Sequence, residues 1–169
     1  SAMICPEYRY LWEGVEKADS IVFNPHKWLG AQFDCSVQFL KDASIQKKTL
    51  SITPEYLKTK GVEGITNLSE YTIQLGRRFR ALKIWFLIRS EGLLGLKGII
   101  RNHVDWTSDL HMKIKSLDNI EIVTDPILSL FTFRFVNQSN SNLDELNERV
   151  IKEINDEGEI YLTPTKVNG

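Results

Sequence analysis

The sequence has 169 residues, 42% of them apolar and 25% charged, and a net charge of −1, which is the profile of an ordinary soluble globular protein. Its 21 basic residues are balanced by 22 acidic ones and interleaved with them, so the pattern excludes the basic stripe that binds nucleic acid. The longest apolar runs, such as residues 84–88, are far shorter than the roughly 20 residues that span a bilayer, and we expect no membrane segment.

The N-terminal segment SAMICPEYRY has no basic region followed by an apolar core, and we expect no signal peptide. Its Cys5 and the second cysteine, Cys35, lie far apart, without a CxxC pattern or a nearby pair of histidines. Neither a disulfide framework nor a zinc site is indicated. We therefore expect two buried, reduced thiols in a cytoplasmic protein.

Two short strands are predicted next. Residues 21–23 form an apolar run that an Asn-Pro pair ends, and residues 36–42 alternate apolar and polar side chains. Lys27 therefore lies in a loop at the end of a strand. Residues 43–76 are rich in Thr, Lys, Gly and Ser, and so long a segment is interpreted as a functional loop or a lid.

Helical periodicity begins at Arg77, in a segment that is apolar almost all round, as expected of a helix buried between two bodies. Gly92 and Gly95 should break this helix, and a second helix should follow to about Leu117. The change of period at Arg77 divides the chain into two parts.

The C-terminal region is predicted as strand, helix and strand. Residues 128–136 place phenylalanines on one face of a strand, Ser141 with Asp144 resembles a capping box, and Gly158 is placed to end the helix. Residues 159–164 would form a last short strand. This order of elements favours an α/β protein of two parts. The first strand pair has no covering helices upstream and the last strand has no closing element, so the chain looks cut at both ends.

Two histidines occur in the second predicted helix. His103 lies on its apolar stripe and His111 lies outside that stripe. We therefore expect a core histidine and a surface histidine, and no metal site.

Lys27 poses the chemical question of this sequence, because a long cationic side chain gains nothing from burial after an apolar run. Beside a histidine ring and an apolar wall, a lysine amine can lose its proton more easily and act as a Schiff-base nucleophile. On chemistry alone, a solvated loop lysine is the simpler interpretation.

The stretch FNPHKWLGAQFDCS, residues 23–36, resembles the pyridoxal-phosphate lysine motif of the group II amino-acid decarboxylases, the family of aromatic-L-amino-acid decarboxylase. The resemblance includes ICPEYRYLWEGVEKADS before this motif and TPEYL, LGRRFRALKIWFLIRSEGLLGL and RNHV after it. It covers essentially the whole chain and weakens after about Asp118. Several separated motifs in the right order make the signal specific.

The resemblance implies roles around the cofactor, pyridoxal 5'-phosphate (PLP). Lys27 would bind PLP covalently, be displaced by the substrate and then carry a proton. Asn24 matches a position that helps to hold the cofactor phosphate, although it is also the turn-forming residue of an Asn-Pro pair. His26 matches a histidine near the cofactor and the substrate carboxylate, and structural packing is the alternative for it.

Two further residues match family positions in and after the predicted lid. Tyr56 matches the loop tyrosine that protonates the carbanion after carbon dioxide leaves, a step during which a lid would exclude water. Without the resemblance, Tyr56 would be interpreted as an interface contact. Gly76 matches a position beside the pocket for the substrate side chain, where glycine favours, though only weakly, an aromatic ring.

The family implies the aspartate-aminotransferase-like fold, fold type I of the PLP-dependent enzymes, and a homodimer. Residues 1–76 would be the end of the large PLP-binding domain, with the catalytic loop at about 43–76. Residues 77–169 would be the interdomain helix and an incomplete small domain. The aspartate that pairs with the pyridine nitrogen and most phosphate ligands would lie upstream of Ser1, so we expect a C-terminal fragment that binds PLP poorly alone.

The activity implied for the parent protein is PLP-dependent decarboxylation of an L-amino acid, with an aromatic one favoured, to the amine and carbon dioxide. One alternative is a decarboxylase of an acidic amino acid such as glutamate or cysteine sulfinate. Another is an aldehyde synthase, against which Tyr56 argues because the synthases resemble this family with phenylalanine there. A non-catalytic binding module and an inactive fragment with a structural role are the remaining alternatives.

Overall fold

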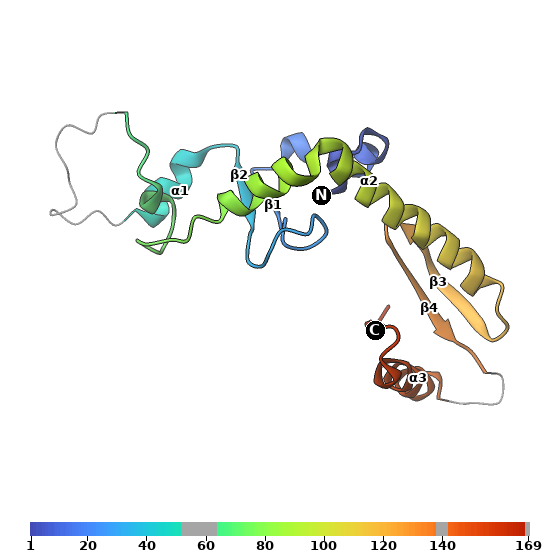
Figure 1. The fold of residues 1–169 in the computed structure, drawn as a ribbon. Coiled ribbons are helices and arrows are strands. Elements are labelled where there is room, and N and C mark those ends of the chain that lie inside the picture. Colours follow the sequence, from blue (N-terminus) through green and yellow to red (C-terminus); the bar gives the residue numbers. More distant parts are fainter. Residues whose placement is uncertain (52–63, 138–141, 168–169) are drawn as a thin grey trace. The chain divides into compact units, whose positions relative to one another are not determined.

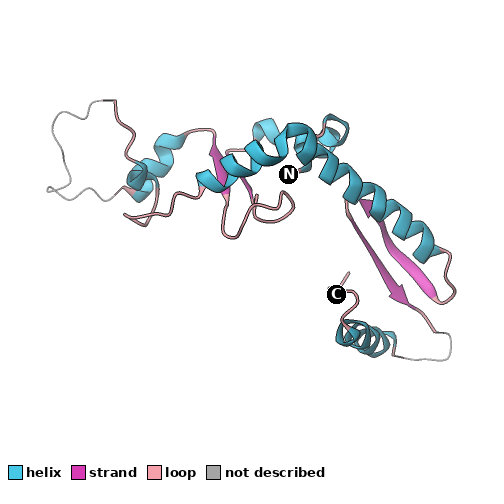
Figure 2. Ribbon diagram, viewed as in Figure 1, coloured by secondary structure: helices cyan, strands magenta, loops and turns pink. Residues whose placement is uncertain are grey.

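The computed structural model describes residues 1–51, 64–137 and 142–167 (Figure 1). The chain divides into two compact units, residues 1–100 and residues 101–169. The helices and strands of both units are shown in Figure 2. In the described ranges no helix is long and apolar enough to cross a membrane.

The first unit opens with short 3-10 helices and a β-hairpin. The helices are η1 (Ala2–Ile4), η2 (Pro6–Trp12) and η3 (Val15–Lys17), and the strands are β1 (Ser20–Phe23) and β2 (Val37–Leu40). The strands pair antiparallel, with Ser20 opposite Leu40 and Phe23 opposite Val37. Both strands predicted from the sequence are confirmed, and the loop between them carries Lys27.

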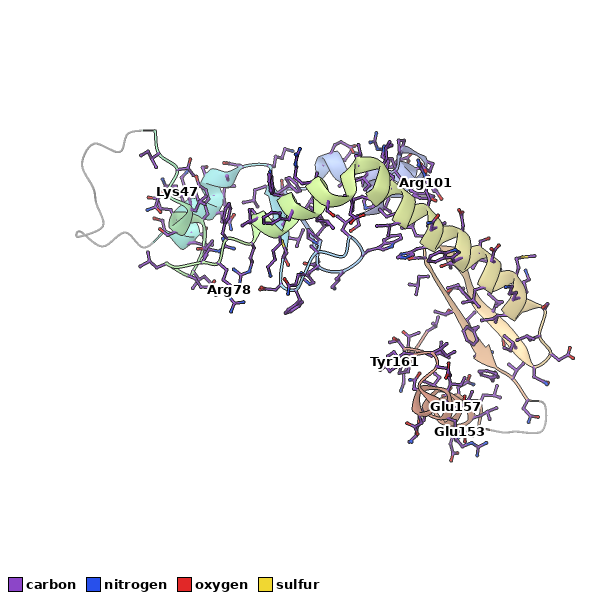
Figure 3. The ribbon with its side chains drawn as sticks, in the orientation of Figure 1. Lys47, Arg78, Arg101, Glu153, Glu157 and Tyr161 are labelled. Carbon is purple, nitrogen blue, oxygen red and sulfur yellow. The ribbon has the colours of Figure 1, made fainter. Side chains whose placement is uncertain are left out.

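Part of the segment interpreted as a functional loop or a lid, residues 43–76, is helical. It contains α1 (Ala43–Leu50) and η5 (Leu68–Tyr71). The side chain of Asp42 accepts a hydrogen bond from the Ser44 backbone N–H at 2.9 Å, which is the N-cap that starts α1. Lys47 on α1, labelled in Figure 3, pairs with Glu70 on η5, and this ion pair joins the two helices.

The long helix α2 (Ala81–Lys115) consists of two helical segments that meet at Gly92. Gly92 has φ 65° and ψ 173°, a conformation that residues with a Cβ rarely adopt. The predicted break is therefore confirmed at Gly92, whereas Gly95 is helical. The helix begins at Ala81 and not at Arg77 as the periodicity suggested.

Two buried thiols tie other segments of the first unit to α2. The Cys5 thiol donates to the Lys97 carbonyl at 3.9 Å, and the Cys35 thiol donates to the Arg80 carbonyl at 3.5 Å. Both cysteines are free and buried, as predicted. Among the described residues of this unit, the others that are fully or nearly fully buried are Ala2, Pro25, Ala31, Leu96 and Ile100.

The second unit contains the C-terminal part of α2, a β-hairpin and a last helix. The hairpin strands are β3 (Ile120–Ile127) and β4 (Leu130–Phe135), which pair antiparallel, and the helix is α3 (Leu143–Glu157). The predicted strand at residues 128–136 is confirmed as β4. β3 was not predicted, and residues 159–164 do not form the predicted strand.

α3 begins and ends with defined caps. The Asn142 side chain accepts from the Glu145 backbone N–H at 3.2 Å and donates to the Glu145 carboxylate at 3.0 Å, so Asn142 is the N-cap of α3. Ser141, where the cap was predicted, lies outside the described residues. Gly158, with φ 79°, ends the helix in the left-handed conformation, as predicted.

The burial of the two histidines of α2 differs from the one expected. His111 is only 8% exposed, and its ring contacts Phe131 edge-on at a centroid distance of 5.4 Å. His103 is half-buried. The prediction failed because β4 covers the side of α2 that carries His111, which helical periodicity alone does not show. Among the described residues, no group of three His, Cys, Asp or Glu side chains could hold a metal ion.

Candidate active site

Lys27 lies in the loop of residues 24–36 that joins β1 to β2, in the first unit. The Lys27 backbone N–H donates to the Asn24 carbonyl at 3.0 Å, and the Gly30 N–H donates to the Lys27 carbonyl at 3.1 Å. Gly30 has φ 76°, which closes the second turn in a conformation suited to glycine. The backbone on both sides of Lys27 is therefore fixed by successive turns.

The side chain of Lys27 is exposed. The described residues do not supply the apolar wall that we expected around it. An exposed primary amine on a fixed turn can attack the carbonyl group of a ligand, which is the chemistry of a Schiff-base lysine.

Asn24 closes the base of the same loop. Its side-chain oxygen accepts a hydrogen bond from the Ser36 hydroxyl at 2.5 Å, so the amide bridges the residues that follow β1 and precede β2. This contact uses the acceptor end of the amide. The NH₂ end can donate to an anionic ligand such as a phosphate.

His26 is held by the backbone of Cys35. The Cys35 N–H donates to His26 Nδ1 at 2.9 Å, and the Cys35 carbonyl lies 2.6 Å from the same nitrogen. A neutral ring nitrogen accepts from one of these groups or donates to the other, and in either tautomer Nδ1 is engaged. Nε2 is therefore the ring nitrogen that can serve a ligand. The Phe33 ring contacts His26 edge-on at 4.9 Å.

Arg80, the residue before α2, contacts the same loop through an ion pair. Arg80 donates from Nε and from a terminal nitrogen to one Asp34 carboxylate oxygen, both at 3.0 Å. The Arg80 hydrogen bond, more than any other contact, lowers the pKa of Asp34 below its ordinary value of 3.8. The Lys83 ammonium donates to the carbonyls of Phe33 and Asp34 at 2.9 and 3.2 Å.

The remaining predicted site residues do not join this cluster in the described structure. Gly76 is exposed, and a Cβ added there would meet nothing within 4 Å. Tyr56 lies outside the described residues. A hollow of about 370 Å³ between β1, β2 and α1 is lined by residues such as Gln38 and Gln46, away from Lys27.

The loop thus carries an exposed lysine, a histidine whose Nδ1 is engaged by the Cys35 backbone, and an asparagine that bonds to Ser36. Residues 1–136 match the family model described as the pyridoxal-dependent decarboxylase conserved domain. Because the match covers more than half of the chain, the chain belongs to the pyridoxal-dependent decarboxylase family.

Similar curated proteins support this family assignment over nearly all of the chain. The chain is 42% identical over 169 residues to aromatic-L-amino-acid decarboxylase of Mus musculus and 37% identical over 174 residues to a tryptophan decarboxylase of Camptotheca acuminata. These alignments cover 99% and 100% of the chain, but 34% and 35% of the two relatives. The chain thus spans about a third of the length of these relatives.

Solved structures give the same result for the fold. Oryza sativa TDC, solved with PLP and tryptamine, matches with a TM-score of 0.92 at 32% identity, over 99% of this chain and 36% of that one. Catharanthus roseus tryptophan decarboxylase, solved with L-tryptophan, matches with a TM-score of 0.87 at 31% identity, over 99% of this chain and 34% of that one. The predicted fold type I is confirmed, and the chain comprises part of that fold.

The sequence did not identify the contacts that α2 makes with the loop. None of the three residues Arg80, Asp34 and Lys83 was singled out from the sequence as a site residue. The Asp34 carboxylate and the Arg80 guanidinium are far apart in sequence, so no local pattern could pair them. The sequence did hold a signal for this ion pair: an acidic residue inside the lysine motif and a basic cluster in a second motif.

Proposed function

We propose that this chain forms part of a PLP-dependent decarboxylase that converts an aromatic L-amino acid to the amine and carbon dioxide. The observation that carries the proposal is the exposed Lys27 on a fixed turn, inside the family's lysine motif and beside a histidine with an engaged Nδ1. Most of the relatives' length lies outside this chain, so the activity is that of the full-length protein.

The side chains of the loop suit PLP chemically. Lys27 would bind the cofactor through its amine, Asn24 would donate its amide N–H to the phosphate, and His26 would place Nε2 toward the cofactor and the substrate carboxylate. When bound, PLP supplies an electron sink for the electrons left on Cα. After carbon dioxide leaves, Tyr56 would donate a proton to Cα, and Lys27 would move a proton during exchange of substrate and product.

An aromatic substrate is favoured over an acidic one. Aromatic-L-amino-acid, tryptophan and tyrosine decarboxylases are among the curated proteins that this chain resembles at 37% identity or more. Gly76 adds no side chain to a position expected to border the substrate pocket, and so leaves room for a ring. A mouse CSAD structure matches at 23% identity, which shows the common fold alone.

An aldehyde synthase is the second candidate. A 4-hydroxyphenylacetaldehyde synthase of Rhodiola rosea matches structurally with a TM-score of 0.84 at 28% identity, over 99% of this chain and 34% of that one. Tyr56 supports decarboxylation to the amine, because a phenol can donate the proton that Cα needs and a phenylalanine cannot. We also propose a homodimer located in the cytoplasm.

Borohydride reduction of the full-length protein loaded with PLP tests the lysine assignment. Reduction should fix the pyridoxyl group on Lys27, as read by peptide mass analysis, and Lys27→Arg should remove the label. Lys41→Arg is the matched control and should retain it. A label on Lys41 or Lys58 would refute the assignment. Incubation with aromatic and acidic L-amino acids, with the amine and the aldehyde both measured, separates the candidate functions.

A further inference from the structure

Residues 33–35 of the Lys27 loop take part in two sets of contacts. On one side they bind the start of α2, and on the other side they hold His26. Both sets lie within the first unit. The segment is therefore a physical connection between α2 and the histidine next to Lys27.

The contacts with α2 are polar and converge on the segment. Arg80 binds the Asp34 carboxylate with two nitrogens, and the Arg80 carbonyl accepts from the Cys35 thiol. Lys83 adds two hydrogen bonds to backbone carbonyls of the segment. The Arg80 and Asp34 side chains are 27% and 37% exposed, so water screens this ion pair only in part.

The contacts with His26 use the backbone of the next residue. Cys35, which is 1% exposed, engages His26 Nδ1 either through its N–H, which donates to the ring nitrogen, or, in the other tautomer, through its carbonyl, which accepts from it. The Cys35 carbonyl also accepts from the His26 backbone N–H at 3.4 Å. Displacing Asp34 from Arg80 would move the peptide unit that ends at the Cys35 nitrogen. The ring of His26 would then lose the contact that sets which nitrogen faces a ligand.

We propose that Arg80 is a positioning residue for His26, acting through Asp34 and the Cys35 backbone. Lys83 supports the same segment. The inference rests on the proposed function, because the orientation of His26 matters for catalysis only if PLP and an amino acid bind beside it. Small displacements of a positioned group can cost a factor of about 100 in rate.

The first test compares Arg80→Met with Arg78→Met in the cofactor-free full-length protein. Methionine keeps an unbranched chain and removes the charge, and Arg78 is an exposed arginine two residues away (Figure 3). In the tautomer whose Nδ1 accepts from the Cys35 N–H, hydrogen exchange of this amide reports the contact directly. Residue-resolved mass spectrometry should show faster exchange at Cys35 in Arg80→Met and wild-type exchange in Arg78→Met.

The second test measures decarboxylation with saturating PLP. Arg80→Met should lower kcat/KM by about 10- to 100-fold at unchanged PLP content. Arg80→Lys should restore part of the loss, because a lysine ammonium can still reach a carboxylate with a single donor group. Arg78→Met should stay within about twofold of the wild-type protein, as expected for an exposed side chain.

Three results would overturn the inference. Unchanged Cys35 exchange in Arg80→Met would show that Arg80 does not hold the segment. Faster exchange with unchanged kcat/KM would show that the contact only supports the fold. Equal effects of Arg80→Met and Arg78→Met would point to net charge. If the wild-type protein decarboxylates no amino acid, the proposed function fails, whereas the exchange comparison still decides whether Arg80 positions His26.

Discussion

Replacing Asn147 with alanine should lower the free energy of opening of the β4–α3 contact by about 2 kcal/mol. Asn147 lies on α3 and is half-buried. Its amide donates to the Phe135 carbonyl at 2.9 Å and accepts from the Phe135 N–H at 2.8 Å, so it completes the backbone hydrogen bonding at the end of β4. The same NH₂ group donates to the Leu143 carbonyl at 2.8 Å.

The magnitude follows from these contacts. Each hydrogen bond to Phe135 contributes about 1 kcal/mol, and a half-buried backbone group without a partner adds a fraction of its desolvation cost, for about 2 to 3 kcal/mol in total. Alanine is a better helix former than asparagine and returns about 0.5 kcal/mol. When opening and closing are fast compared with the exchange step, the exchange rate depends only on the opening equilibrium. A net loss of about 2 kcal/mol then makes exchange of the Phe135 amide roughly 30-fold faster.

Native-state hydrogen exchange of the full-length protein measures this directly. Glu148→Ala is the matched control, because Glu148 is the exposed neighbour on the same helix. Asn147→Asp should cost at least as much as Asn147→Ala, since a carboxylate would face the Phe135 carbonyl. Exchange at Phe135 that changes less than threefold in Asn147→Ala, or no more than in Glu148→Ala, would refute the reasoning.

Two further predictions concern the Lys27 loop and the catalytic proton. Tyr56→Phe in the full-length protein should reduce amine formation by about 10²- to 10⁴-fold and favour aldehyde and hydrogen peroxide, which parallel assays of amine and peroxide would detect. Unchanged amine with a raised KM would mean that Tyr56 only packs. Because Arg80 lowers the pKa of Asp34, the ion pair should stabilise the fold fully above the ordinary Asp value of 3.8 and lose its effect as the pH falls through the lower folded value. Urea midpoints of the wild-type protein and Asp34→Asn should therefore differ at neutral pH and converge in strong acid; a constant difference would contradict this.

Local signals predicted those parts of the fold that local chemistry decides. An apolar run ended by an Asn-Pro pair gave β1, and Gly92 and Gly158 ended helices because both adopt positive φ. The N-cap of α3 is Asn142, one residue later than predicted, and the many polar residues around this position permit that shift. The family resemblance, carried by separated motifs, predicted the fold, which is confirmed, whereas the role it implies for Lys27 stays a prediction.

Contacts between distant residues explain most of the errors. β3 contains Asp125 and Pro126, which interrupt its alternation, and it exists because it pairs with β4. Residues 159–164 look like a strand in sequence, but Leu162 bonds to the side chain of Asn155 instead of to another strand. The ion pair between Asp34 and Arg80 likewise follows from the fold and from no local pattern.

The β1–β2 hairpin has a consequence for how the site is assembled. Within the described residues the two strands pair only with each other, and Val22 and Phe39 are 60% and 58% exposed. A two-stranded hairpin is marginally stable in water, and its open edges invite further strands. The chain spans about a third of its relatives, so sequence outside it can supply those strands. We expect the loop that carries Lys27 to reach its final geometry late in folding, after further strands have paired with the hairpin. We expect the 169-residue chain alone to self-associate along the same strand edges.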